Sequence, residues 1–408
     1  MKIVMLAHFA GSPVHGMVYG HYYLAREWTR AGHEVTIVSA SFSHVRAQQP
    51  VARGRGGEEI IDGIRYIWLP TPSYRPDQTA LRVLNLLAFS LRSWLACPRI
   101  GPADLVVCSS HHPFAIHAAL RLARRWRARL VFEVRDLWPL TLIELGRAST
   151  KHPLIRAMQW SEDRAYRHAD TVVSVLPKAR NYMVGRGMAP EKFVHVPNGI
   201  PLGAVHEQRP LPQGHIREIE RQRGLGRMLV GYAGRIGEAN ALFDLADAMA
   251  RIDDKPLAVL LMGHGQHAEA LRTHVRRLGL GDRFVLLDPV TKSQVPDFLH
   301  RVDVAYIGLR KSPLFRHGVS PNKLNDYMLA GKPIVCAIDT PENPVELSGS
   351  GLVCPPEDPQ AIALALSAML EMSPQERAGL GARGRSWLLE HRDIRVLSQR
   401  FLEAAMNG

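Results

Sequence analysis

Residues 320–335 read SPNKLNDYMLAGKPIV, and this stretch holds a helix start, a helix end and the beginning of a buried strand. Ser320 followed by Pro321 is typical of an N-cap with proline at the first helical position. Gly331 is typical of the residue that ends a helix, and the apolar run Pro333–Ala337 predicts a buried strand. A helix that leads into a strand in this way is one unit of an α/β fold.

The same alternation of strand-like and helix-like stretches runs in both directions along the 408 residues. Helical periodicity is clearest in Tyr22–Ala31, Pro113–Arg127 and Ala361–Met372. In the first half the expected strands are Lys2–Ala7, Glu34–Ala40, Ile64–Leu69, Leu105–Ser109, Leu130–Val134, Thr171–Val175 and Phe193–Val196. In the second half they are Leu229–Ala233, Ala258–Met262, Phe284–Leu287, Val304–Ile307, Pro333–Ala337 and Gly351–Val353. Repeated strand–helix units predict parallel sheets in an α/β fold.

Each half opens with a strand and a glycine-containing turn, as a nucleotide-binding α/β domain does. Segment 197–225 is rich in proline, glycine and charge, a composition that favours a linker. We therefore predict two Rossmann-like domains, at 1–200 and 201–385, that face each other across a cleft. Residues 386–408 are expected to form a C-terminal helix that packs back on the first domain. Ligands should bind at the carboxyl ends of the strands.

The composition is that of a globular chain with an unusual charge. Apolar residues make up 46% and charged residues 22%, which argues against a disordered or collagen-like chain. The four cysteines are scattered and form no CxxC pair, so we expect neither a disulfide framework nor a zinc site. The net charge of +13 predicts an anionic partner, either a phosphorylated substrate or an anionic lipid. No nucleic-acid-binding motif accompanies the charge, so we do not expect nucleic acid to be that partner.

Two motifs of the second half predict a site for a diphosphate. The free amides of Asn322 and Lys323 would point out of the start of the expected helix, where an anion is stabilised. Asp326 lies one turn later, where its carboxylate can accept hydrogen bonds from both hydroxyls of a ribose. The turn at 231–237, GYAGRIG, carries Arg235, a residue type that binds oxyanions in a bidentate manner. The alternative is an ordinary capped helix with a solvated aspartate.

Polar residues also follow the expected strands of the first half. Gly16 lies in the loop after the first strand and permits a close backbone approach. His111 is placed to bond a substrate hydroxyl or to act as acid or base, unless it only closes its loop. Arg135 and Asp136 lie at the end of another expected strand and are candidates for contact with the substrate. Charged groups at such a position need partners, so a purely structural ion pair is the alternative. No histidine spacing matches HExxH or HxH, so we predict no metal site.

One segment predicts contact with a surface. Residues 79–97 read TALRVLNLLAFSLRSWLAC, an apolar stretch that Arg82 and Arg92 make too short to span a membrane. Five further arginines lie between residues 121 and 129. The region 75–130 is therefore expected to bind an anionic membrane surface. The alternative is a buried helix beside a solvated basic face.

Taken in order, these motifs resemble the glycosyltransferases of family 4, which have the GT-B fold. The pieces that carry the resemblance are the opening strand with its glycine loop, YYLAREWTRAGHEVTIVSASFSHVR, FEVRDLWP, HVPNGI, GYAGRIGEANAL, LLMGHG and SPNKLNDYMLAGKPIV. FEVRDLWP and SPNKLNDYMLAGKPIV resemble the bacterial branch that builds O-antigen, capsule or exopolysaccharide. The resemblance implies a retaining transfer from a UDP-sugar with no metal ion or other cofactor.

The resemblance also implies roles for individual residues. Those that would bind the donor are Gly16, Arg235, Asn240, Ser320, Asn322, Lys323 and Asp326. Asp326 takes the place of the second Glu of a Glu-x7-Glu motif, which binds the ribose, and Gly318 takes the place of the first. Asn240 stands where the family has the lysine of an Arg/Lys pair at the pyrophosphate. The histidine that touches the donor sugar falls on Arg135, so the expected catalytic group is Asp136, Arg135 and His111.

The expected activity is that of a hexosyltransferase with its acceptor on the first domain and its nucleotide sugar on the second. It would move an N-acetylated amino or deoxy sugar to a saccharide on undecaprenyl diphosphate, in lipopolysaccharide or related surface polysaccharide synthesis. The expected location is the cytoplasm, peripheral on the inner face of the cytoplasmic membrane. Two alternatives remain open at this point. One is a non-hydrolysing UDP-sugar 2-epimerase, and the other is a degenerate regulatory subunit that binds a nucleotide sugar.

Overall fold

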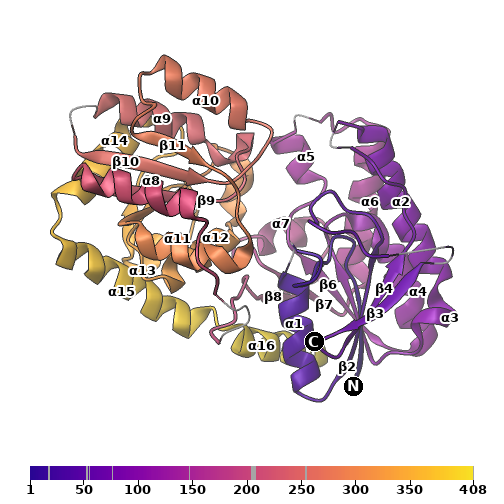
Figure 1. Ribbon diagram of the computed structural model, residues 1–408. Coiled ribbons are helices and arrows are strands. Elements are labelled where there is room, and N and C mark those ends of the chain that lie inside the picture. Colours follow the sequence, from indigo (N-terminus) through magenta and orange to yellow (C-terminus); the bar gives the residue numbers. More distant parts are fainter. Residues whose placement is uncertain are drawn as a thin grey trace. The chain divides into compact units, whose positions relative to one another are not determined.

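The chain divides into two compact units, each built on its own sheet (Figure 1). The structure is a computed structural model that describes residues 1–407 except 17–18, 52–53, 55, 76, 147, 204–207 and 253–254. Unit 1 comprises Met1–Gly199 and Ile394–Gly408, and unit 2 comprises Ile200–Asp393. The helix that returns to unit 1 therefore begins at Ile394 and not at residue 386, because the preceding helix still belongs to unit 2.

Unit 1 contains an eight-stranded sheet in the order β3-β4-β2-β1-β5-β6-β7-β8. Every neighbouring pair is parallel except β3 and β4, which pair antiparallel. The strands are β1 (Lys2–Leu6), β2 (Glu34–Ala40), β3 (Gly57–Ile61), β4 (Ile64–Leu69), β5 (Leu105–Ser109), β6 (Arg129–Val134), β7 (Thr171–Ser174) and β8 (Phe193–His195). The strand order reverses at β1, which lies between β2 and β5. Ligands of such sheets bind at the carboxyl ends of the strands beside this point.

The helices of unit 1 come from both ends of the chain. They are α1 (Gly20–Arg30), α2 (Thr79–Leu95), α3 (Cys97–Ile100), η1 (Pro113–Ala115), α4 (Ile116–Trp126), α5 (Leu140–Glu144), α6 (Pro153–His168), α7 (Arg180–Gly185), η2 (Pro190–Lys192) and α16 (Ile394–Asn407). Helix α16 is held by Trp28, whose indole donates to the carbonyl of Ser398 at 3.0 Å and packs against Phe401. Thr171 of β7 donates to Ala404 at 3.1 Å. The C-terminal helix is therefore an integral part of unit 1.

Unit 2 contains a six-stranded, fully parallel sheet in the order β11-β10-β9-β12-β13-β14. Its strands are β9 (Met228–Ala233), β10 (Leu257–Met262), β11 (Phe284–Leu287), β12 (Val304–Gly308), β13 (Ile334–Ala337) and β14 (Gly351–Val353). Its helices are α8 (Gln213–Gly224), η3 (Glu238–Asn240), α9 (Leu242–Arg251), α10 (Ala268–Arg277), η4 (Lys292–Gln294), α11 (Val295–Arg301), η5 (Pro313–His317), α12 (Asn322–Leu329), α13 (Pro344–Ser348), α14 (Pro359–Glu371) and α15 (Pro374–His391). The order reverses between β9 and β12, which makes the carboxyl ends of these two strands the expected ligand edge.

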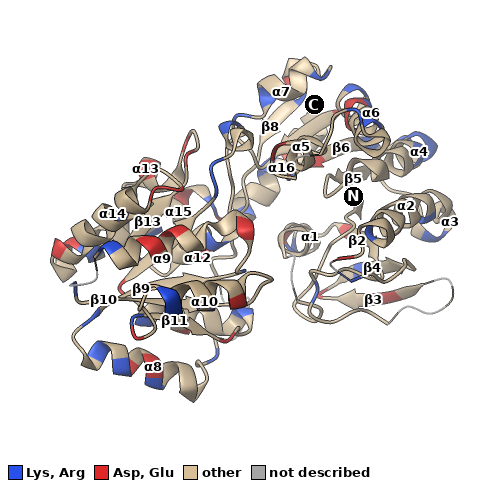
Figure 2. Cartoon of the chain, turned by 90° about the horizontal axis from the view of Figure 1, so that it is seen from above, with Lys and Arg blue, Asp and Glu red and all other residues tan. Residues whose placement is uncertain are grey.

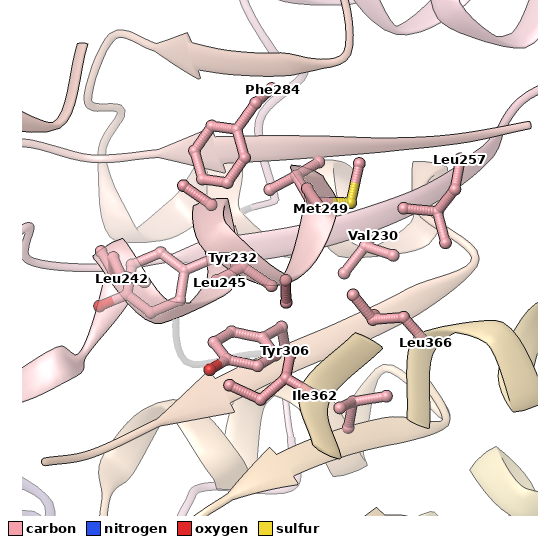
Figure 3. Packing of buried hydrophobic residues seen from close by; sticks show 14 of the residues in the cluster. Val230, Tyr232, Leu242, Leu245, Met249, Leu257, Phe284, Tyr306, Ile362 and Leu366 are labelled. Carbon is pink, nitrogen blue, oxygen red and sulfur yellow. The ribbon is translucent and has the colours of Figure 1, made fainter. Parts of the chain in front are cut away.

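The core of unit 2 follows the two-residue period of its strands. Val230 and Tyr232 of β9 face one side of the sheet, where they pack with residues of α9, α10 and α14 (Figure 3). Leu229 and Ala233 face the other side, where α8, α11 and α12 cover them. Strands buried on both faces read as continuous apolar runs, which is why the sequence shows them clearly. The prediction of two α/β domains with parallel, Rossmann-like sheets is therefore confirmed.

Two local predictions were wrong. Residues 213–224, which have the composition of a linker, form helix α8 because Ile216 and Ile219 pack against the core of unit 2. Strand β3 was missed altogether. It pairs with β4 through a tight turn at Asp62 and Gly63, both of which have positive φ angles (50° and 78°).

Candidate functional site

The loop that follows β9 lies at the ligand edge of unit 2 and is held by a second glycine-containing loop after β10. A Cβ atom on Gly263 would lie 1.8 Å from the carbonyl oxygen of Gly234. A Cβ atom on Gly265 would lie 2.0 Å from the carbonyl oxygen of Ile236. Neither position can carry a side chain without moving the loop after β9. The motif LLMGHG therefore shapes the turn that carries Arg235.

The side chain of Lys323 reaches from α12 to this loop. Its partly buried Nζ donates to Tyr232 Oη and to Asn240 Oδ1, each at 2.7 Å, and lies 4.3 Å from the centre of the Tyr232 ring. Burial lowers the pKa of Lys323 to about 7. Among the described residues no carboxylate pairs with this ammonium. Two predicted donor-binding residues, Asn240 and Lys323, are thus in direct contact.

The start of α12 differs from its prediction. The N-cap is Pro321 and not Ser320, no side chain caps the helix, and the first helical residue is Asn322. Pro321 is extended (φ −73°, ψ 123°), which leaves its carbonyl to accept from Leu324 N at 3.1 Å. Within the described residues the amides of Asn322 and Lys323 have no acceptor. A helix start with free amides is suited to an anion.

Helix α12 also presents Asp326, whose carboxylate accepts from Lys292 Nζ at 2.5 Å. Tyr327 fixes the helix against β9, because its hydroxyl accepts from Ala233 N at 3.1 Å. Gly318 takes the place of the first Glu of the Glu-x7-Glu motif, and its φ is +97°. An L residue is strained in that conformation, so the backbone before α12 has taken a form that favours glycine.

Arg235 is the second cation of this edge. Its side chain is exposed, and in the part of the chain that the structure describes it has no hydrogen-bond or ion-pair partner. Its carbonyl accepts from Tyr232 Oη at 2.7 Å, which fixes the turn. Arg235, Lys323 and the start of α12 therefore form a basic half-site, which we call the anion edge of unit 2. The predicted roles of its residues stay predictions.

A buried charge network lies at the carboxyl ends of β5 and β6 in unit 1. His21 Nε2 lies 2.9 Å from Glu133 Oε2 and 2.9 Å from Ser109 Oγ. Arg135 donates to Glu133 at 2.9 Å and to Asn198 at 2.6 Å. Strand β6 ends at Val134, one residue before Arg135. Sequence reasoning identified the need for partners but missed His21, which comes from α1.

The network stabilises its carboxylate and restrains its arginine. Burial alone would raise the pKa of Glu133, but His21 and Arg135 hold this pKa well below its usual range. The side chain of Arg135 is only 9% exposed. A Cβ atom on Gly20 would lie 2.9 Å from Arg135 Nη2, so α1 begins with glycine where the guanidinium packs. These contacts give Arg135 a structural role inside unit 1.

We expect Glu133→Gln to lower the free energy of unfolding by about 3 kcal/mol, because it leaves the buried Arg135 without its countercharge. Urea denaturation of the full chain measures the loss. Glu58→Gln is the matched control, since Glu58 of β3 also binds arginines, Arg65 and Arg99, but its side chain is 38% exposed. An exposed pair contributes about 0–1 kcal/mol. Equal losses in the two variants would contradict a structural role for the buried network.

The other predicted residues of unit 1 lie around this network. His111 is within 3.5 Å of Ser109 Oγ, and burial together with His21 and Arg135 holds its pKa well below the usual value. The side chain of Asp136 is exposed just beyond Arg135. Gly16 has a φ of +72°, and a Cβ atom there would lie 2.9 Å from Ala47 Cβ. Gly16 therefore lets the loop after β1 pack closely against Ala47 in the loop after β2.

A pair of buried histidines lies where the strand order of unit 1 reverses. His8 follows β1 and His112 follows β5, and their ring nitrogens lie 3.0 Å apart. Each residue is 1% exposed. Burial lowers the pKa of His112 to about 3. Burial, His112, His111 and Arg46 also lower the pKa of His8, although the neighbouring side chain of Asn85 opposes the shift.

Helix α2 turns its apolar face outward. Among its buried residues are Asn85 and Ser93, whereas its exposed face is formed by Leu81, Leu84, Leu87, Leu91, Trp94 and Leu95. This is the reverse of an ordinary amphipathic helix, in which the apolar stripe faces the core. We call these six residues the outer face of α2. The prediction of an apolar helix in the region 75–130 is confirmed, and the alternative of a buried helix is wrong for this face.

The outer face of α2 continues into an open, apolar groove of about 330 Å³ lined by Leu87, Ser90, Leu91, Trp94, Phe114 and His117. Arg121 of α4 lies 3.6 Å from the ring centre of Trp94, and the exposed Trp160 of α6 stacks on His117. Arginines of α4 appear in blue beside α2 in Figure 2. Among the described helices, none is both long and apolar enough to cross a membrane. The described residues also hold no cluster of three or more metal-ligating side chains.

Comparison with known proteins assigns both units to glycosyltransferases. Residues 15–199 match the family described as "Glycosyl transferase 4-like domain". Residues 227–372 match the family described as "Glycosyl transferases group 1". The two matches fall on unit 1 and unit 2 and together include most of the chain.

Individual relatives agree with these matches. The chain is 23% identical, over 75% of its own length and 75% of the relative's, to WcaI of Escherichia coli (strain K12), named as a colanic acid biosynthesis glycosyl transferase. Its fold is similar to a sucrose-phosphate synthase from Thermosynechococcus elongatus, with a TM-score of 0.76 and 16% identity over 100% of this chain and 98% of that one. It is also similar to Anabaena HepE, solved in complex with UDP-glucose, with a TM-score of 0.68 and 16% identity over 100% of both chains. The chain therefore belongs to glycosyltransferase family 4 and has the GT-B fold.

Proposed function

We propose that this chain transfers a sugar from a UDP-sugar to a lipid-linked saccharide in the synthesis of a bacterial surface polysaccharide. The observation that carries the proposal is the anion edge of unit 2, where Tyr232 links Lys323 of α12 to the backbone of Arg235. Lys323, Arg235 and the free amides of α12 have no anionic partner among the described residues. HepE, which shares the fold, was solved with UDP-glucose, and WcaI is named for colanic acid synthesis. Both names support a nucleotide-sugar donor and a polysaccharide product.

The proposed chemistry follows from where negative charge develops. As the glycosidic bond breaks, the departing diphosphate gains charge, which the start of α12, Arg235 and Lys323 would stabilise. Asp326 would hold the ribose through its two hydroxyls. The acceptor hydroxyl would attack from the side of the leaving group, and a diphosphate oxygen would take its proton, which gives retention. We expect no metal ion or other cofactor to be needed, because these groups supply the positive charge.

The donor is tested by the thermal stability of the purified chain in a panel of nucleotides and nucleotide sugars. A ligand at 100 times its Kd should add about 2.7 kcal/mol of stability. We expect stabilisation by UDP and a larger effect from one UDP-sugar, which would then be used in a transfer assay with a polyprenyl-diphosphate saccharide. Conversion of the UDP-sugar without an acceptor would instead identify an epimerase. Failure of every nucleotide to stabilise the folded chain would contradict the proposal.

The acceptor side of the proposal rests on the outer face of α2. Exposed leucines and Trp94 suit the boundary between lipid headgroups and acyl chains, and the neighbouring arginines suit anionic lipid. We propose that this face places unit 1 on the cytoplasmic membrane, where a lipid-linked acceptor resides. Asp136 and His111 would then orient the acceptor hydroxyl. Unchanged kcat/KM in Asp136→Ala would exclude Asp136 from that role.

Membrane binding is measured by co-sedimentation with liposomes that contain anionic lipid. Removing four charges on and beside α4 is expected to weaken binding at least tenfold, since each cation near the surface contributes about 1 kcal/mol. The variant replaces Arg121, Arg124, Arg125 and Arg127 by Gln. The matched control removes the same charge from exposed residues of unit 2, by replacing Arg251, Arg272, Arg276 and Arg277 by Gln. Equal effects of the two variants, or none, would contradict the membrane proposal.

The apolar part of the same face is tested separately. Leu87→Ser with Leu91→Ser removes apolar surface from α2 without changing the charge. We expect weaker binding to neutral as well as to anionic liposomes, because apolar insertion does not depend on lipid charge. Unchanged binding to both kinds of liposome would contradict the insertion of the outer face of α2 into the membrane.

A further inference from the structure

The ammonium of Lys323 is a positive charge that unit 2 binds only through neutral groups. Tyr232 Oη donates its own hydrogen to the carbonyl of Arg235, so its oxygen accepts from Lys323. The second acceptor is the amide oxygen of Asn240. The ammonium has three N–H groups, and two of them are used within the described residues. A partly buried charge in this state is costly unless an anion completes its surroundings.

The position of this ammonium is fixed by the loop after β9. A Cβ atom on Gly234 would lie 3.2 Å from Lys323 Nζ, so the absence of a side chain at 234 leaves room for the ammonium. Lys323 is also the second residue of α12, beside amides that have no acceptor among the described residues. The ammonium and the helix start are therefore two independent features that favour the same ligand, an anion.

We propose that the Lys323 ammonium binds the diphosphate of the nucleotide donor and that Asn240 is a positioning residue, which holds this ammonium and does not itself contact phosphate. The inference rests on the proposed function and identifies Lys323 as the residue that supplies a cation in addition to Arg235. It also changes the role that the sequence suggested for Asn240. The cation comes from Lys323 of α12, 83 residues after position 240. Its Nζ donates to the side chain of Asn240, which stands where the family has a lysine.

The contact with Lys323 explains why residue 240 has an amide side chain and not a lysine. Its Oδ1 accepts from the ammonium at 2.7 Å, so a lysine at 240 would bring a second ammonium to the same place. Like charges at that distance repel strongly when partly buried. One cation is therefore expected at either 240 or 323, and a swap of the two residues should preserve the site.

The test is a titration of the full chain with UDP and with uridine, which lacks the diphosphate. Lys323→Met is expected to lower the affinity for UDP at least tenfold, as the loss of a hydrogen bond to a charged group does. Its affinity for uridine should stay within about twofold. The swap of Lys323→Asn with Asn240→Lys should recover most of the UDP affinity, whereas Asn240→Lys alone should lower it. Lys332→Met is the matched control, because Lys332 donates to the carbonyl of His300 and lies just beyond the other end of α12.

The outcomes separate this inference from the proposed function. UDP binding by the unaltered chain with equal affinity in Lys323→Met would overturn the inference and leave the donor proposal standing. A parallel loss of UDP and uridine binding would also overturn it, because the lysine would then support the fold of the site and not the diphosphate. No binding of any nucleoside diphosphate by the unaltered chain would overturn the proposed function and this inference with it.

Discussion

Replacing Asp326 by alanine is expected to lower kcat/KM for the nucleotide-sugar donor about a thousandfold. A ribose diol donates two hydrogen bonds to a carboxylate, and hydrogen bonds to charged groups contribute about 1.5–3 kcal/mol each. Their loss corresponds to about 4 kcal/mol, or three orders of magnitude in kcat/KM. The carboxylate is oriented by α12 and held by Lys292 at 2.5 Å, so it is fixed before the donor arrives.

Two variants distinguish the contribution of the Asp326 carboxylate from that of its partner Lys292. Asp326→Glu, which restores the residue type of the family motif, should keep kcat/KM within about tenfold of the unaltered chain, because it still offers two acceptor oxygens. Lys292→Met should also have a small effect, since it removes the partner and not the carboxylate. The thermal stability of each variant without ligand shows whether it is folded. An active Asp326→Ala would exclude Asp326 from the donor site.

Acidification is expected to destabilise unit 1 steeply below about pH 6.5. The pKa of His112 is lowered to about 3 and that of His8 is also well below its usual value, so the unfolded chain binds more protons than the folded one. Their stabilisation is complete above the unfolded pKa of about 6.5 and is lost as the pH falls toward the folded values. The pKa of His111 is lowered as well, so three histidines together give a slope of about 4 kcal/mol per pH unit. Urea denaturation between pH 7.5 and pH 5 measures it.

A variant of one histidine tests whether these buried histidines cause the slope. His112→Phe removes one of the three titrating histidines and should reduce the slope by about a third, even though it also lowers the stability at pH 7.5. His391→Asn changes an exposed histidine of α15 and should leave the slope as it is. A slope that is the same in all three proteins would show that other groups govern the acid sensitivity.

The sequence predicted the sheets well because their strands are buried on both faces. Runs such as Leu229–Ala233 are continuously apolar, and such runs are distinct from their surroundings. Strand β3 was missed since it is a short edge strand whose sequence, GEEII, shows neither a continuous apolar run nor a regular polar–apolar alternation. The turn Asp62–Gly63 is the signal that would have identified it, because Asp-Gly is typical of a tight hairpin.

The anion edge was predicted in its residues but not in its contacts. The sequence indicated the glycine loop, Arg235 and the start of α12, because these depend on local backbone patterns. It did not show that Lys323 and Asn240 touch, since that contact joins segments 83 residues apart. Composition also misled at α8, where charge and proline suggest a linker although two isoleucines bury one face.

The orientation of the apolar face of α2 is another feature that the sequence alone could not decide. Its apolar residues were evident, but the sequence left a buried helix and a surface helix as equal alternatives. Only packing decides between them, and here Asn85 and Phe89 face the interior while the leucines face outward. The His21–Glu133 contact was hidden for a similar reason, because its two partners are 112 residues apart.

Hydrogen exchange of the full chain with and without UDP tests the central claim most directly. The account predicts slower exchange in three segments of unit 2. They are 231–240, which contains the loop after β9, 288–294, which contains η4, and 320–327, which contains the start of α12. Uridine should slow exchange less at the start of α12, because it lacks the diphosphate that would occupy the free amides. UDP that binds without protecting these segments, or that protects only segments of unit 1, would contradict the assignment of the donor site to the anion edge.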